Sequence, residues 1–147
     1  MNFIYNLFTG PSSETLNFAI LFLRISMGIL TMLHGVPKMS GGVQGWNNLG
    51  ITFMYPLGIH FMPVMWGFLG AATEFIGGIM LTFGFATKIV SFCLIMMMII
   101  ATLWHVKRGD SFNLYSFPLS LIFVYGFFLL VGGYNYSIDQ YLFRLFS

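Results

Sequence analysis

The chain has few charges and only one thiol. Its 147 residues include four acidic side chains, six basic side chains and a single cysteine, and the net charge is +2. A lone cysteine, Cys93, excludes an intrachain disulfide and a paired-cysteine redox centre. The small net charge argues against nucleic-acid binding, which needs a strongly basic surface. Three scattered histidines and four carboxylates do not form a credible metal-binding set.

Recognisable catalytic motifs are missing as well. The sequence contains no glycine-rich phosphate loop, no His-Glu-x-x-His zinc helix and no nucleophile elbow. No pattern predicts a covalently bound cofactor, so a redox role would require electrons from a partner protein. Whether the chain is itself an enzyme stays open on the sequence alone.

Apolar residues dominate the composition. The chain is 58% hydrophobic, with 18 Phe and 11 Met, and its mean hydropathy is +0.86. This composition predicts an integral membrane protein, and long uninterrupted apolar runs favour helices over the alternating strands of a barrel. We predict an all-α fold in which residues 1–147 form one transmembrane four-helix bundle. The spans, each long enough to cross a bilayer, are expected at about 15–36, 64–84, 88–106 and 117–133.

Short interfacial segments are expected at both termini and in the first connection. Apolar side chains recur on one helical face in residues 3–8 and again in residues 141–146. The segment of residues 43–53 in the first connection carries Trp46, which we expect at the level of the lipid headgroups. Four spans place both termini and the turn before Lys88 on one side of the membrane, here called side one. The other two connections lie on side two. The distribution of Lys and Arg does not decide which side is cytoplasmic.

Glu74 is a carboxylate in the middle of an otherwise uncharged span. An ionised group at this depth costs several kcal/mol unless it faces the protein interior and finds a partner. Aligning the centres of the first two spans puts Arg24 and Glu74 within about 3 Å of the same depth. We therefore predict an Arg24–Glu74 ion pair. Such a pair either fixes the helix register or lines a ligand cavity, and the sequence leaves both roles open.

A second group of polar residues is expected toward side two. His34 lies about 12 Å from the midplane, His105 lies at nearly the same depth, and Lys38 follows His34 by one helical turn. Trp104 lies at the same level. The last span has no charge and contributes almost no polar group to this cluster. Three interpretations fit: an aromatic belt with interfacial histidines, a headgroup pocket for a quinone, or haem held by His34 and His105. The candidate pocket residues are Arg24, His34, Lys38, Glu74, His105 and Trp104.

Three motifs in this order resemble the DoxX family of small four-helix bacterial membrane proteins. They read LFLRISMGILTMLHGVPKMSGG, AATEFIGGIMLTFGFATK and GGYNYSIDQYLF, and the resemblance covers about residues 16–143. Asn135 stands where members often carry a basic residue. The resemblance implies an inner-membrane protein, associated in some members with a thiosulfate:quinone oxidoreductase, a terminal oxidase or an oxidative-stress complex. The polar positions that match the family's motifs residue by residue are Arg24, His34, Lys38 and Glu74.

The leading hypothesis is a membrane subunit of a quinone-linked redox complex, with a pocket for a lipid-soluble ligand on side two. Arg24 and Glu74 would form its deep end. The alternative is a non-catalytic structural or assembly subunit of a larger membrane complex. A small transporter is a third hypothesis, although no internal repeat supports it. The bilayer and a redox protein are the expected partners, and a homodimer through the uncharged last span is also expected.

Overall fold

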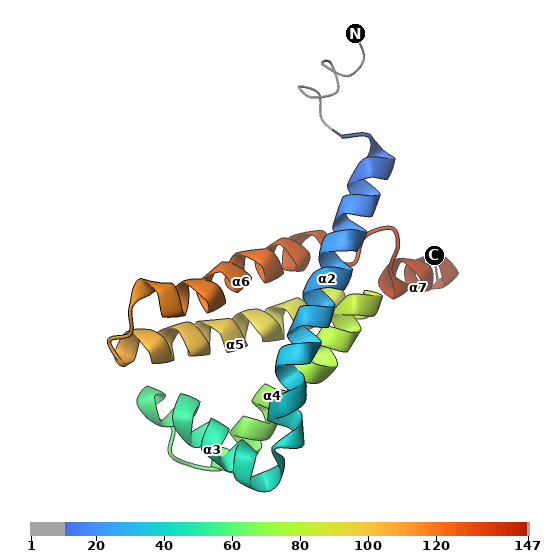
Figure 1. Cartoon of the computed structure of the whole chain (residues 1–147). Helices are drawn as coiled ribbons and strands as arrows, with labels where there is room; N and C mark the ends of the chain where they lie inside the picture. The colour runs from blue at the N-terminus through green and yellow to red at the C-terminus, as the bar shows by residue number, and fades with distance from the viewer. Residues whose placement is uncertain (1–10, 147) are drawn as a thin grey trace.

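The computed structural model describes residues 11–146, and these residues form helices and connecting turns without any strand (Figure 1). The predicted segment 3–8 lies outside the described residues. The elements in order are α2 (Ser13–Ser40), α3 (Gly42–Met54), the 3-10 turn η1 (Tyr55–Leu57), α4 (Pro63–Phe83), α5 (Thr87–Lys107), α6 (Phe112–Val131) and α7 (Ile138–Phe146). Four of them, α2, α4, α5 and α6, are long and apolar enough to cross a membrane. The predicted all-α fold is confirmed.

Two helix boundaries differ from the prediction. α4 and α5 begin and end within one residue of the expected limits, but α2 continues through Pro37 to Ser40. A proline removes only the hydrogen bond to the carbonyl four residues earlier, and helices in membranes tolerate this loss. α6 begins at Phe112, so Pro118 lies in its second turn and not in its first. Both extensions add residues to side two.

Glycines bring α2 and α4 into close antiparallel contact. A Cβ atom at Gly28 would overlap Thr82, and a Cβ atom at Gly35 would overlap the backbone of Phe75. Gly78 on α4 approaches the backbone of Met32 in the same way. Small residues at such spacings let membrane helices associate without a hydrophobic driving force. These contacts fix the register of the two helices.

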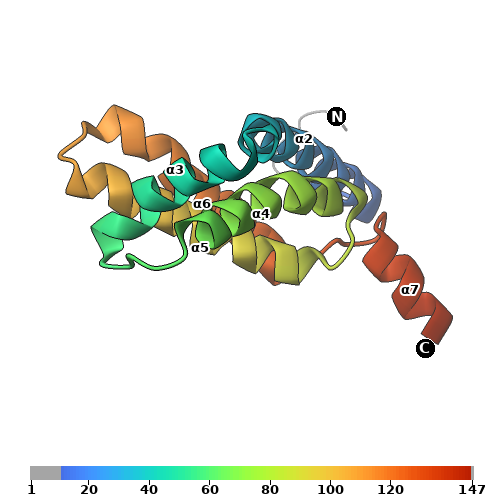
Figure 2. The ribbon, with the colours of Figure 1, turned by 90° about the horizontal axis from the view of Figure 1, so that it is seen from below.

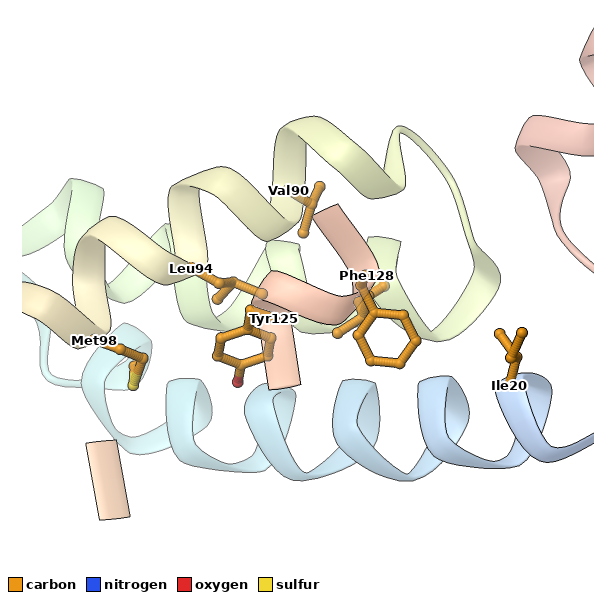
Figure 3. Packing of buried hydrophobic residues seen from close by; sticks show 7 residues of the cluster. Ile20, Val90, Leu94, Met98, Tyr125 and Phe128 are labelled. Atoms are coloured by element: carbon orange, nitrogen blue, oxygen red, sulfur yellow. The ribbon is translucent and has the colours of Figure 1, made fainter. Parts of the chain in front are cut away.

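The second helix pair, α5 and α6, encloses most of the buried core. Leu94 and Val90 on α5 pack with Tyr125 and Phe128 on α6, and Leu81 of α4 closes the cluster (Figure 3). All five side chains are at most 5% exposed. The core therefore lies toward side one, where α4 turns into α5.

The two helix pairs diverge toward side two. Figures 1 and 2 show α5 and α6 running side by side, while α2 and α4 cross them near the α4–α5 turn and then separate from them. α3 lies along α4 in this opening, and the glycines Gly50 and Gly67 allow the close backbone contact. The backbones of the two pairs are therefore farther apart on side two than on side one.

The C-terminal segment is fixed to the α4–α5 turn by Asp139. Its carboxylate accepts hydrogen bonds from the backbone N–H groups of Ala86 at 2.6 Å and Thr87 at 2.8 Å. Its own N–H donates to the carbonyl of Gly84 at 2.9 Å. The carboxylate thus satisfies unpaired donors at the start of α5, as an N-cap residue does.

α7, whose first turn contains Asp139, projects from the bundle (Figures 1 and 2). The Ser137 hydroxyl caps the start of this helix, since it accepts from the N–H of Gln140 at 3.2 Å. Tyr141, Leu145 and Phe146 are exposed in the structure. An amphipathic helix at this level, beside the end of a span, has the features of an interfacial helix.

Candidate functional site

A cavity of about 590 Å³ occupies the space between the diverging helix pairs. Its volume falls in the range of small-molecule sites, and most of its lining is apolar. Side chains from α2, α4, α5 and α6 form the walls, and Phe53 of α3 contributes on side two. The polar lining residues are Thr31, His34, Lys38, Glu74, His105, Ser120 and Tyr125.

Four of the six candidate pocket residues line this cavity. They come from three helices: His34 and Lys38 from α2, Glu74 from α4 and His105 from α5. The structure thus brings together residues that are up to 71 positions apart in the sequence. The two other candidates, Arg24 and Trp104, lie outside the lining and have different roles.

Glu74 pairs with Lys38 and not with Arg24. Lys38 Nζ donates to Oε1 at 2.6 Å and to Oε2 at 2.5 Å. The Glu74 side chain is 5% exposed and that of Lys38 is 32% exposed, so the pair is buried mainly on the carboxylate side. The prediction of an Arg24–Glu74 pair is therefore wrong.

The helix register explains this error. Because Gly35 packs directly against the backbone at Glu74 and Phe75, the carboxylate is level with the last third of α2. Arg24 lies 11 residues before Gly35, roughly 16 Å away along the axis. The two helices are thus staggered and their centres do not coincide. Lys38 reaches Glu74 because α2 continues past Pro37.

Arg24 instead joins α2 to the C-terminal segment on side one. Its guanidinium is buried, and Nη2 donates to the backbone carbonyl of Tyr136. The side chain lies against Gly84, which has a φ of +67° and leaves no room for a Cβ atom. Nε and Nη1 have no hydrogen-bond partner among residues 11–146. Arg24 therefore connects the third sequence motif to the first.

His105 is oriented by Asp110, which the sequence reasoning did not select. Its Nδ1 lies 2.7 Å from Asp110 Oδ2. The available signal was the turn at the end of α5, where Gly109 has a φ of +74° and returns the chain toward the helix. Arg108 Nε lies 3.8 Å from the same oxygen. Histidine side chains at functional sites are commonly held by a carboxylate in this way.

Trp104 supports this arrangement from outside the cavity. Its ring centroid lies 4.6 Å from that of His105 and 5.3 Å from that of Phe53. The Arg108 guanidinium carbon lies 4.4 Å above the Trp104 ring, within the range of a cation–π contact. Trp104 thus holds residues that line the cavity and does not line it itself.

The inner end of the cavity is closed by a hydrogen bond between α2 and α6. Thr31 Oγ1 and Tyr125 Oη are 2.7 Å apart, and both side chains are buried. Figure 3 shows the Tyr125 oxygen pointing toward α2. The expectation that the last span contributes almost no polar group was wrong, since it supplies both Tyr125 and Ser120. A hydroxyl within an apolar span was the overlooked signal.

The rim of the cavity is mostly apolar and lies between α2 and α6. Leu30, Leu114 and Phe117 line the cavity and are each more than half exposed. The His34 ring, also exposed, lies 5.7 Å from the Phe117 ring across this gap. Both helices are long and apolar enough to cross a membrane, so the opening lies between two candidate spans.

Comparisons with known proteins agree with the motifs in the sequence. The family model DoxX matches residues 19–107, which contain α3, α4, all but the first turns of α2, and α5. A relative named "Putative oxidoreductase CatD", from Bacillus subtilis (strain 168), is 24% identical over 135 residues, covering 90% of this chain and 92% of the relative. No solved structure matches the chain. The chain therefore belongs to the DoxX family and is a multi-pass membrane protein.

Proposed function

We propose that the protein is a subunit of a quinone-linked redox complex in the bacterial inner membrane and binds a quinone-type ligand in the cavity. The observation that carries this proposal is the cavity itself, which joins an apolar lateral opening to a polar end. A lipid-soluble carrier has the same two parts, an apolar tail and a polar ring. The ring would lie near Lys38 and Glu74, and the tail would leave between α2 and α6.

The electrons would come from a partner protein. Residues 11–146 contain no group of three or more His, Cys, Asp or Glu side chains that could hold a metal ion. The relative from Bacillus subtilis is named as an oxidoreductase, which supports a redox role by similarity. In this proposal the chain binds and orients the carrier at a fixed depth, and the partner exchanges electrons with it.

Filling the cavity tests the proposal. Ala101 lines the cavity, and an Ala101→Phe substitution would occupy part of the ligand volume. Decylubiquinone binding to the purified protein in nanodiscs should weaken at least tenfold in this variant. Ala19→Phe is the matched control, because Ala19 is exposed on α2 and does not line the cavity. Equal binding by both variants and the wild type, or no binding at all, would refute the proposal.

Purification of the native complex tests the partner. Redox proteins that co-purify with the chain support the proposal. Co-purification of non-redox proteins alone would instead favour the hypothesis of an assembly subunit. The observation that supports this second hypothesis is the hydrogen bond of Arg24 to the C-terminal segment, which is a structural role.

A further inference from the structure

The three hydroxyl groups of the cavity lining have already used their hydrogens within the protein. Thr31 donates to the carbonyl of Met27 at 2.6 Å, and Ser120 donates to the carbonyl of Phe117 at 2.8 Å. Since a threonine hydroxyl has a single hydrogen, Tyr125 must be the donor in its 2.7 Å bond with Thr31. Tyr125 and Ser120 therefore retain only lone pairs for a ligand.

Glu74 and His105 also offer acceptors. An ionised carboxylate has no hydrogen to donate, and Glu74 faces the cavity beside Lys38. Asp110 can only accept, so the hydrogen of a neutral His105 ring lies on Nδ1 and Nε2 retains a lone pair.

Donors are few in comparison. Lys38 directs two of its three ammonium hydrogens at the oxygens of Glu74, which leaves one for a ligand. His34 has no hydrogen bond within the described part of the chain, so one ring N–H remains available there. Pro118 has no N–H to donate to the Leu114 carbonyl, so this carbonyl lacks its usual helical partner.

We propose that the cavity selects the reduced, hydroxylated form of an aromatic ring, a hydroquinone, over the corresponding quinone. This inference rests on the proposed function and specifies its ligand. Each of the two hydroquinone O–H groups would donate to one acceptor of the set that includes Tyr125, Ser120 and His105. The carbonyl oxygens of a quinone can only accept, so they would offer no hydrogen to these lone pairs. A buried acceptor that is left without a donor in this way, such as Tyr125, weakens binding roughly 5- to 150-fold.

The preference has an electrochemical consequence. Tighter binding of the reduced form raises the midpoint potential of the bound couple. A tenfold preference corresponds to about 30 mV for a two-electron couple. Hydroquinones occur with a lipid tail or as small free phenols, and the acceptor groups would recognise both.

Binding of matched ligand pairs tests the inference. Decylubiquinol and decylubiquinone differ only in the redox state of the ring, and their affinities are measured anaerobically for the protein in nanodiscs. The quinol should bind at least tenfold more tightly. A Tyr125→Phe/Ser120→Ala variant, which removes two acceptors, should lower this ratio at least threefold. Should the double variant fail to fold, Ser120→Ala alone, at the exposed rim, should lower the ratio in the same direction.

The chain provides a control on the same helix. A Tyr115→Phe/Ser116→Ala variant makes the same chemical changes on α6 outside the cavity lining and should leave the ratio unchanged. Equal affinities, tighter quinone binding, or a ratio that the cavity variants do not alter would overturn the inference while leaving the proposed function intact. Failure of both ligands to bind would overturn both.

The affinity for a hydroquinone without a tail distinguishes the two possible ligands, a membrane quinol and a small free phenol. Affinity within threefold of decylubiquinol would assign the site to a free phenol. Affinity at least a hundredfold weaker would assign it to a membrane quinol, because the tail then contributes most of the binding.

Discussion

Removing Lys38 from its pair with Glu74 should destabilise the protein far more than removing the charge of Glu74. In Lys38→Met, a carboxylate that is 5% exposed loses the partner at 2.5 Å. Breaking a buried ion pair in this way costs about 3–5 kcal/mol. In Glu74→Gln the remaining ammonium belongs to a side chain that is 32% exposed and can turn toward water. The expected cost of this second change is about 1 kcal/mol, in the range of a lost hydrogen bond.

The double variant Lys38→Met/Glu74→Gln should recover most of the loss, because no unpaired charge remains. The free energy of unfolding is measured in mixed micelles with increasing SDS. Lys88→Met removes an exposed lysine near the α4–α5 turn and is the control, with an expected effect below about 0.5 kcal/mol. Equal costs for Lys38→Met and Glu74→Gln, or additive costs in the double variant, would refute the argument.

Two further substitutions test the packing that positions the cavity. Gly78→Ala places a Cβ atom against the backbone of Met32 and should cost about 1–3 kcal/mol of unfolding free energy, whereas Gly126→Ala, where nothing lies within 4 Å of the added atom, should be neutral or stabilising. A gain in stability for Gly78→Ala would contradict the α2–α4 contact. Asp139→Ala removes the acceptor of the Ala86 and Thr87 amides and should cost about 1 kcal/mol. Amide hydrogen exchange at these two residues should accelerate, and unchanged exchange would argue against the anchor.

The fold was largely predictable because each span is set by a local property of the sequence. Length and hydropathy are enough to place α4 and α5. The prolines were harder to interpret, because a proline can end a helix or be tolerated within it. Pro37 and Pro118 lie inside helices, and both predicted boundaries failed at these positions.

The candidate site was only partly predictable for a related reason. Residues at a matched depth, such as His34 and His105, were correctly brought to one side of the bundle. The partner of Glu74 depends on the axial offset between α2 and α4. The sequence of each span taken separately does not give this offset. Asp110 and Tyr125 were missed because a turn and an interhelical hydrogen bond give them their roles.

Photolabelling provides the most direct test of the central claim that the cavity holds a quinone-type ligand. A photoreactive decylubiquinone analogue is crosslinked to the protein in nanodiscs, and the modified residues are identified by mass spectrometry with and without excess decylubiquinol. We expect labels on cavity-lining residues of α5 and α6, such as Met98 and Leu121, and we expect excess decylubiquinol to suppress them. Labels confined to lipid-facing residues such as Phe123 and Leu130, and insensitive to the competitor, would contradict it.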